Sequence, residues 1–383
     1  MFNKLFSWIA LATVLSFSFL TSCRNADVLP PSEKQQVQDS ARTTSVKGFY
    51  LLNQGNMGSN KTTLDYYDLA TGVYTLNLYS AVNPSEVMSM GDLGNDLKIY
   101  GNRMYVTVNG SNVVEVMDAR TAKHIGTIAV PNCRYLCFSG RYGFVSSYAG
   151  PVLMDDEYKQ RGYIAKFDTA TLNIVDTCHV GFQPDGVAVA GIKLYVANSG
   201  GYLMPNYETT VSVIDIATMK ELHRIGVNIN LNHLCTDRYG QLWVTSSGDY
   251  VTRPSKLYCI DTATDCVTDS VDLPAGGMWL AGDSLYTEAS YYYSLTGEYV
   301  YGILNVRTHE VVTRNFISDG TDKDVMEPYG IAVHPKTGDI YLMDAKTYVV
   351  PGALHCYDRS GRHKWTVRTG DIPVSMAFLT HTK

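Results

Sequence analysis

The 383-residue chain has no excess of basic residues and few charged residues of either sign. Lys and Arg total 31 against 37 Asp and Glu, and charged residues make up 18% of the chain. Because a nucleic-acid-binding protein needs a basic surface, this balance argues against nucleic acid as a partner. Hydrophobic residues make up 45% of the sequence, so the chain can bury a large core in one or two globular domains.

The sequence also lacks the short motifs that identify common catalytic and metal centres. It contains no His-Glu-x-x-His or Cys-x-x-Cys motif, no phosphate-binding glycine loop, no Gly-x-Ser-x-Gly motif and no Rossmann fingerprint. We therefore expect no transition-metal site and no cofactor. Cys133 and Cys137 lie too far apart along one predicted strand to form a disulfide. Cys259 and Cys266 flank a predicted turn, where a disulfide and a pair of thiols are both open.

Only one long apolar run is present, at the N-terminus. Residues 5–20 are almost entirely apolar, which is shorter than the about 20 residues that span a bilayer. This is typical of a signal peptide, which we expect at residues 1–22. Leu20-Thr21-Ser22-Cys23 resembles a bacterial lipobox, which implies that Cys23 is lipidated and anchors the protein to a membrane. A secretory signal peptide without a lipid is the alternative.

Residues 23–47 show neither the alternation of a strand nor the periodicity of a helix. They are polar and include Pro30-Pro31, so we expect a flexible tether between the lipid anchor and the folded domain. The folded domain is then expected at residues 48–383.

The rest of the chain is an internal repeat with a period of roughly 45–50 residues. In each copy, a strand of alternating apolar residues ends in Asp or Asn, and Thr usually follows three residues later. These anchor residues are Asp68, Asp118, Asp168, Asp215, Asp261, Asn305 and Asp358. A side-chain acceptor followed by Thr favours a tight turn, so we expect the acids to be structural. Two further strands precede each anchor and one follows it, which gives four strands per repeat.

Four antiparallel strands at this period predict an all-β fold, a seven-bladed β-propeller. The folded chain enters at Phe49 on the second strand of a blade, and residues 374–378 near the C-terminus resemble a first strand. We therefore expect the C-terminal strand to complete blade one and close the ring. Gly-His and Trp-Asp dipeptides are absent, which argues against a WD40 propeller.

Several segments resemble known propeller families. Tyr195-Val196-Ala197-Asn198, with residues 184–189 before it and 211–215 after it, resembles the YVTN-type (YncE-like) propellers. Residues 53–60, followed by residues 64–68, are similar to outer-membrane lipoprotein propellers, some of which capture vitamin B12 for a TonB-dependent transporter. The resemblance implies cobalamin or a related corrinoid as ligand and a TonB-dependent transporter as partner. It also implies a lipid-anchored position at the outer membrane, on the cell surface.

Strand order assigns every connection to one of two faces, and the loops on these faces differ in length. First-to-second and third-to-fourth connections are short, whereas several second-to-third connections on the opposite face are long. Long loops on a rigid scaffold carry binding, and Tyr suits a flat or amphipathic ligand such as a corrin, a glycan or a protein. The expected binding residues in these loops are Tyr148, Asn198, Tyr202, Tyr207, Tyr250, Tyr291, Tyr292 and Tyr348. Alternatively, the tyrosines pack the loops against one another.

Connections between blades bring further polar residues to the central mouth on the same face. By the repeat register these are Asp92, Asn132, Arg134, Asp185, Asn232, His233, Met278, Glu327, Tyr329 and Asp371. Such a ring suits the amide groups of a ligand. We expect a non-catalytic ligand-binding protein for cobalamin or another small nutrient. Carboxylates at the mouth leave open a metal-assisted lactone or ester hydrolase, and a protein-interaction module at the cell surface is a third interpretation.

Overall fold

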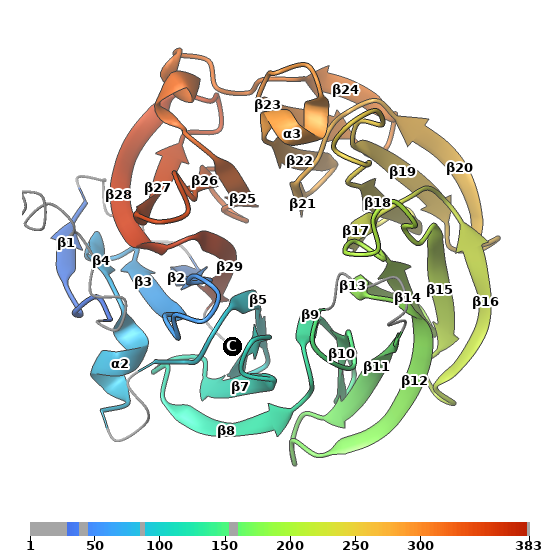
Figure 1. Ribbon diagram of the computed structural model, residues 1–383. Coiled ribbons are helices and arrows are strands. Elements are labelled where there is room, and N and C mark those ends of the chain that lie inside the picture. Colours follow the sequence, from blue (N-terminus) through green and yellow to red (C-terminus); the bar gives the residue numbers. More distant parts are fainter. Residues whose placement is uncertain (1–28, 38–44, 85–88, 153–159, 381–383) are drawn as a thin grey trace, which may run out of the picture.

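The computed structural model describes residues 29–37, 45–84, 89–152 and 160–380. These residues form seven antiparallel β-sheets arranged as a ring around a central opening (Figure 1). The prediction of an all-β, seven-bladed propeller is confirmed. The signal peptide expected at residues 1–22 and the lipid anchor expected at Cys23 lie outside the described residues. Among the described helices, none combines the length and the apolar character needed to cross a bilayer.

The first four blades follow one another along the chain, and in blades two to four the first strand lies nearest the central opening (Figure 1). Blade one contains β2 (Val46–Asn53), β3 (Thr63–Asp68) and β4 (Val73–Thr75), and blade two contains β5 (Gly94–Tyr100), β6 (Arg103–Val108), β7 (Val113–Asp118) and β8 (His124–Ala129). Blade three contains β9 (Cys133–Ser139), β10 (Tyr142–Ser147), β11 (Arg161–Asp168) and β12 (Ile174–Phe182), and blade four contains β13 (Pro184–Ala190), β14 (Lys193–Asn198), β15 (Thr210–Asp215) and β16 (Lys220–Gly226).

The remaining blades repeat the same order, and the last strand returns to blade one. Blade five contains β17 (Leu231–Thr236), β18 (Gln241–Ser246), β19 (Lys256–Asp261) and β20 (Cys266–Val271), and blade six contains β21 (Gly277–Ala281), β22 (Ser284–Ala289), β23 (Val300–Asn305) and β24 (Glu310–Thr313). Blade seven contains β25 (Pro328–Val333), β26 (Ile340–Asp344), β27 (Pro351–Tyr357) and β28 (His363–Asp371), and β29 (Pro373–Thr380) follows. The short helices are α2 (Leu78–Val82), α3 (Tyr291–Ser294) and η1 (Thr321–Asp324).

The repeated acids at the ends of the third strands close tight turns, as their spacing predicted. Asp118 ends β7, and its Oδ1 accepts hydrogen bonds from the backbone N–H groups of Arg120 at 3.0 Å and Thr121 at 2.9 Å. Asp168 and Asp215 accept in the same way from the residues two or three positions later. These carboxylates accept hydrogen bonds from backbone N–H groups, so they stabilise the hairpin turns between the third and fourth strands.

The C-terminal strand closes the ring, as the repeat register predicted. β29 pairs antiparallel with β2, with Phe49 opposite Phe378. The fully buried Phe49 ring also packs against Tyr341 of blade seven, with 4.8 Å between ring centroids, and against Tyr67, with 5.2 Å. The first blade therefore contains both ends of the folded chain and is held to the last blade by aromatic packing.

The expected tether is partly wrong, because some of its residues join blade one. β1 (Lys34–Gln36) pairs antiparallel with β4 as a fifth strand, with Gln35 opposite Tyr74. Glu33 extends this contact, since its backbone oxygen accepts a hydrogen bond from the N–H of Leu76 at 2.8 Å. A strand of three residues is too short to display an alternating pattern, so the sequence gives no signal for it.

The two cysteines beside the predicted hairpin turn are free thiols. Cys259 lies opposite Asp269 in the ladder between β19 and β20, and Cys266 lies opposite Asp261. Cys259 is buried and Cys266 is exposed. The open question of a disulfide is therefore settled against one, because the register does not place the two residues opposite each other.

Phe49→Ala should destabilise the protein by about 3–5 kcal/mol, because it removes a fully buried ring at the joint between the first and last blades. Urea unfolding followed by fluorescence measures the change. Val312→Ala on the exposed edge of blade six, where the side chain is 63% exposed, is the control and should change stability by less than about 0.5 kcal/mol. Equal effects of the two substitutions would contradict the role given to Phe49.

Candidate functional site at the centre of the ring

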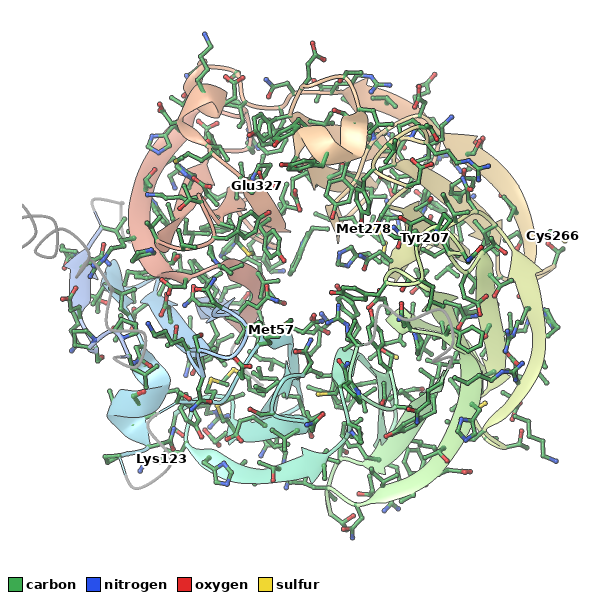
Figure 2. All side chains as sticks on the ribbon, in the orientation of Figure 1. Met57, Lys123, Tyr207, Cys266, Met278 and Glu327 are labelled. Atoms are coloured by element: carbon green, nitrogen blue, oxygen red, sulfur yellow. The ribbon has the colours of Figure 1, made fainter. Side chains whose placement is uncertain are left out.

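The first strands of the blades surround a central cavity of about 1700 Å³. This volume exceeds the roughly 300–1,000 Å³ of pockets for drug-sized ligands. Every blade contributes lining residues, among them Met376, Lys98, Leu136, Val187, Leu234, Met278 and Ile331. Met57, Met278 and Glu327 lie toward the central opening, whereas Lys123 and Cys266 lie on the outer rim (Figure 2).

The long loops open onto one end of this cavity. The connections between the second and third strands contribute Met57, Tyr202, Tyr250, Tyr292 and Tyr348 to its lining. On the opposite face, the turns between the first and second strands span only a few residues, for example between β9 and β10. The predicted difference between the two faces is therefore present, and the tyrosine-rich face surrounds the mouth.

The structure brings most of the predicted site residues to the cavity. Asn132, Arg134, Tyr202, Asn232, His233, Tyr250, Tyr292, Glu327, Tyr329 and Tyr348 line it, as do Asp92 and Met278. Tyr148, Asp185, Asn198, Tyr207, Tyr291 and Asp371 are not among the lining residues. Two of these residues, Tyr148 and Asp185, contact Arg134, which does line the cavity.

Arg134 of blade three lies in the cavity wall and is held by two buried neighbours. Its Nε is 3.0 Å from Oδ1 of Asp185 in blade four, and its guanidinium lies 4.9 Å from the centre of the Tyr148 ring. The Tyr148 hydroxyl donates to the same Asp185 oxygen at 2.8 Å. Burial raises the pKa of Tyr148, so its hydroxyl stays a donor. Asp185 and Tyr148 thus fix the position of Arg134 and balance its charge.

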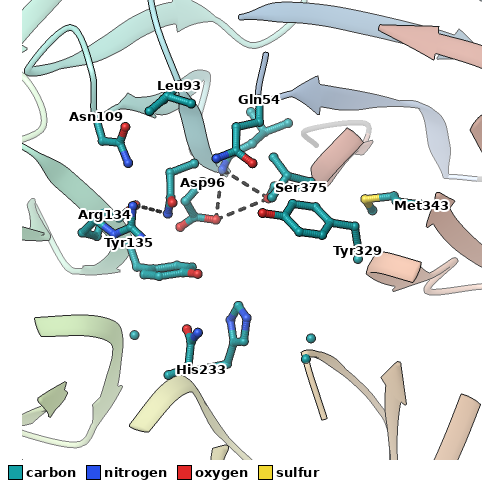
Figure 3. A pocket seen from close by; sticks show the side chains of 18 of the residues that line it. Gln54, Leu93, Asp96, Asn109, Arg134, Tyr135, His233, Tyr329, Met343 and Ser375 are labelled. Atoms are coloured by element: carbon teal, nitrogen blue, oxygen red, sulfur yellow. Dashed lines mark hydrogen bonds between the residues drawn. The ribbon is translucent and has the colours of Figure 1, made fainter. Parts of the chain in front are cut away.

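Aromatic rings form another part of the cavity lining. The Tyr135 ring packs edge-on against the His233 ring with 5.2 Å between centroids, and Tyr329 packs against Tyr348 with 5.5 Å. Arg134 and Tyr135 project from one side of the cavity, and Tyr329 projects from another (Figure 3). Burial lowers the pKa of His233, so this ring is neutral at physiological pH.

Asp96 on β5 is a buried cavity residue that the sequence analysis missed. Its carboxylate accepts hydrogen bonds from the backbone N–H of Leu136 at 3.0 Å and from the Ser375 hydroxyl at 3.3 Å. It also pairs with Lys98 Nζ at 2.6 Å. Asp96 therefore connects the inner strands of blades one, two and three (Figure 3). A single acid inside a predicted strand carries no motif that would have revealed this role.

Three of the predicted binding residues in or beside the long loops do not line the cavity. Asn198 is fully buried, and its amide donates to the hydroxyls of Thr210 at 3.0 Å and Ser212 at 2.9 Å within blade four. Tyr291 packs on Tyr292 with 4.0 Å between ring centroids and stays outside the lining, as does Tyr207. In loops the side-chain direction follows no period, so the sequence does not distinguish Tyr292 from Tyr291.

Glu288 at the end of β22 forms a pair of buried carboxyls with Glu327 in the cavity wall. Burial and the charge of Glu327 raise the pKa of Glu288 to about 8. Burial also raises the pKa of Glu327, and this rise is opposed by the Tyr348 hydroxyl, which donates to Glu327 Oε1 at 3.0 Å. Glu288 is therefore mostly protonated at neutral pH, and the pair can donate as well as accept hydrogen bonds.

Alignment of the repeats with one another distinguishes Glu288 from the residue at the same position of another blade. Residues 285–288 read Leu-Tyr-Thr-Glu, and the corresponding segment of blade four, residues 194–197, reads Leu-Tyr-Val-Ala. Glu288 thus stands where another blade has a small apolar residue. The partner strand accommodates it with Gly277, where an added Cβ would lie 2.5 Å from Glu288 Oε1. An acid at an inward position beside a glycine is unusual in a core strand.

Comparison with protein families places this propeller in a known group. The model of the family described as "Domain of unknown function (DUF5074)" matches residues 47–369. The chain belongs to the DUF5074 family. No curated protein matches this DUF5074 chain.

Solved propellers are similar to the DUF5074 chain in fold. A quinoprotein alcohol dehydrogenase-like protein of Bacteroides thetaiotaomicron has a TM-score of 0.62 at 14% identity, covering 87% of this chain and 78% of its own. Hydrazine synthase of Kuenenia stuttgartiensis has 0.55 at 17%, covering 70% and 76%. The WD40 domain of Neurospora crassa Pan2 has 0.52 at 8%, covering 73% and 79%. At these identities the likeness shows the propeller fold alone.

Glu288→Gln should make the stability of the DUF5074 propeller less dependent on pH. A carboxyl whose pKa is raised in the folded state stabilises it below pH 4.5, and this contribution is lost as pH rises through about 8. Relative to the variant, the wild-type protein should lose a few kcal/mol of unfolding free energy between pH 5 and pH 9, at about 1.4 kcal/mol per pKa unit. Urea unfolding at pH 5, 7 and 9 measures the difference.

Glu298→Gln, at an exposed position in the connection between β22 and β23, is the control and should keep the wild-type pH dependence. Parallel pH profiles for Glu288→Gln and the wild-type protein would show that Glu288 titrates normally.

Proposed function

We propose that this DUF5074 propeller is a non-catalytic binding protein that captures a large amphipathic nutrient in its central cavity, with cobalamin or a related corrinoid as the first candidate. The observation that carries the proposal is the cavity of about 1700 Å³ with a mouth of tyrosines. A propeller is a rigid scaffold, and Tyr provides a large contact area and a hydroxyl at low entropic cost. Such a mouth suits a flat ligand with polar groups at its edge.

Unpaired acceptors in the cavity wall support a ligand that brings N–H groups. The side-chain oxygens of Gln54 and Asn232 are buried and have no hydrogen-bond partner among the described residues, and both residues line the cavity. Leaving a buried acceptor unpaired costs on the order of 1–3 kcal/mol. A corrinoid carries primary amides around a flat ring, so its N–H groups would satisfy these oxygens. The choice of corrinoid itself comes from the family resemblance.

Membrane attachment and delivery to a transporter complete the proposal. Residues 20–23 support a lipid anchor at Cys23 and hence a place at the outer membrane, on the cell surface. On the loop face, Met57 is 79% exposed, Val251 is 78% exposed and Val349 is 62% exposed. Exposed apolar side chains around a binding site favour a protein partner. A TonB-dependent transporter that receives the ligand at this face is the partner we propose.

The arrangement of the acids favours binding over a metal-assisted lactone or ester hydrolase. Asp185 is paired with Arg134, Glu327 accepts from Tyr348, and Asp371 does not line the cavity. These three of the four acids expected at the mouth thus have separate surroundings. In the ranges that the structure describes, no three His, Cys, Asp or Glu side chains are grouped so as to hold a metal ion.

Isothermal titration of the mature chain without residues 1–23 with cyanocobalamin tests the proposal. We expect a dissociation constant in the micromolar range or tighter. Tyr202→Ala at the cavity mouth should weaken binding at least tenfold, about 1.4 kcal/mol, because it removes a stacking surface. Tyr239→Ala is the matched control, since Tyr239 is 43% exposed against 41% for Tyr202 but lies in a turn on the opposite face.

Absence of both heat and retention on a cobalamin resin would remove cobalamin as the ligand. Equal weakening by Tyr202→Ala and Tyr239→Ala would remove the loop face as the site of binding.

A further inference from the structure

Two acids and three tyrosines form one corner of the cavity, built by blades six and seven. We call Glu288, Glu327, Tyr293, Tyr329 and Tyr348 the acidic corner, and all five line the cavity. Glu288 is the penultimate residue of β22, Tyr293 lies in α3, Tyr329 lies in β25, and Tyr348 follows β26. The corner is therefore assembled from elements that the rigid ring holds at fixed positions.

Glu288 is a buried carboxyl of the corner that lacks a hydrogen-bond donor within the residue ranges that the structure describes. Its side chain faces the cavity, and the residue is only 2% exposed. Its carboxyl has no hydrogen-bond donor among the described residues, whereas Glu327 receives the Tyr348 hydroxyl at 3.0 Å. Gly277 beside it leaves the space that the carboxyl occupies. A buried carboxyl that faces open space without a donor is positioned to receive one from a ligand.

The Arg and Lys side chains that line the cavity form ion pairs with acids outside the acidic corner. Arg134 is paired with Asp185, and Lys98 is paired with Asp96. In the described part of the chain, neither Glu288 nor Glu327 forms an ion pair with Lys, Arg or His. The tyrosine rings add the negative faces of their π-systems, which attract cations. Two carboxyls and three aromatic rings without a cation are complementary to a positive charge.

We propose that the acidic corner is a subsite for an organic cation that carries N–H donors, an ammonium, amidinium or guanidinium group. This goes beyond the proposed function, because it assigns a second kind of ligand group to the cavity and does not depend on a corrinoid. The flat face of an amidinium or guanidinium stacks on Tyr329 or Tyr293. Its N–H groups reach the carboxyls of Glu288 and Glu327.

Binding of the cation displaces a proton to solvent. Before binding, Glu288 holds that proton at neutral pH, because burial and Glu327 raise its pKa to about 8. When the cation arrives, Glu288 ionises and one positive charge replaces another, so the net charge of the corner is unchanged. Besides the three tyrosines of the corner, the titratable groups that interact electrostatically with Glu288 or Glu327 are Tyr291, Tyr299, Tyr301 and Asp344.

None of these neighbours competes for the proton near neutral pH. Burial raises the pKa of Tyr329 to about 12 and raises that of Tyr293 well above its usual value, while burial lowers the pKa of His233 in the cavity wall. The pKa of Asp344 is lowered, because hydrogen bonds from His355 and backbone N–H groups outweigh its burial. Glu288, with its pKa of about 8, is thus the group of the corner that changes its charge near neutral pH.

Titration with benzamidine and with its neutral counterpart benzamide tests the subsite in the mature chain. We expect benzamidine to bind at least tenfold more tightly than benzamide at pH 7.5. Its affinity should rise about tenfold per pH unit between pH 5.5 and pH 7 and level off above pH 8, as Glu288 becomes ionised in the free protein. Calorimetry in buffers of different ionisation enthalpy should show roughly one proton released per benzamidine at pH 7.

Three substitutions test whether benzamidine binds at the acidic corner. Glu288→Gln should weaken benzamidine binding at least tenfold and abolish proton release, and Glu327→Gln should weaken binding in the same direction. Glu298→Gln, which is exposed, is the matched control and should bind benzamidine as the wild-type protein does. Thermal melting confirms that each variant is folded.

Equal affinity for benzamide and benzamidine would overturn the proposal. Unchanged benzamidine binding in Glu288→Gln and Glu327→Gln would also overturn it, as would benzamidine binding without proton release. Because the titration contains no corrinoid, its result is independent of the cobalamin test.

Discussion

The pairing of β29 with β2 is the constraint on which the rest of the molecule depends. It joins the two ends of the folded chain and leaves no open edge between the first and last blades. Only a closed ring places the inner strand of each blade around a common axis. Asp96 shows the consequence, since its carboxylate accepts from Ser375, which lies 279 residues away in the sequence. The cavity is thus a product of closure, and no single blade contains it.

Much of this architecture can be predicted from the sequence, because the patterns that indicate it involve residues close together along the chain. The turn of Asp118 forms within four residues, so its recurrence revealed the period and the number of blades. Strand alternation then placed residues on faces, and the register of blades three and seven brought Arg134 and Tyr329 to the cavity. These predictions succeed because each depends on neighbours along the chain and on a symmetry that repeats them.

The parts that escaped prediction depend on contacts between distant segments. Asn198 ends a strand beside a long loop and resembles a binding residue, but Thr210 and Ser212 of the next strand use its amide. Glu288 has no motif, and its significance arises from Glu327 in the following blade. β1 is recognisable only by its pairing with β4, because three residues cannot show a period. Composition and spacing do not reveal the contacts of Asn198 or the pairing of β1, and for Glu288 they show only an acid where blade four has Ala197.

The two sides of the cavity differ in how their charges are balanced, and this difference bears on what the cavity is for. Asp185 and Tyr148 satisfy Arg134 internally, so that side is complete without a ligand. Glu288 has no such partner, and its raised pKa means that the folded ring holds a carboxyl in an unfavourable place. Glu288 is held in this place because its strand is paired on both sides, with Gly277 of β21 and Tyr301 of β23 opposite it. Strain of this kind persists at positions where a ligand relieves it, which is why the acidic corner, rather than the Arg134 pair, is the feature of the cavity that most requires an occupant.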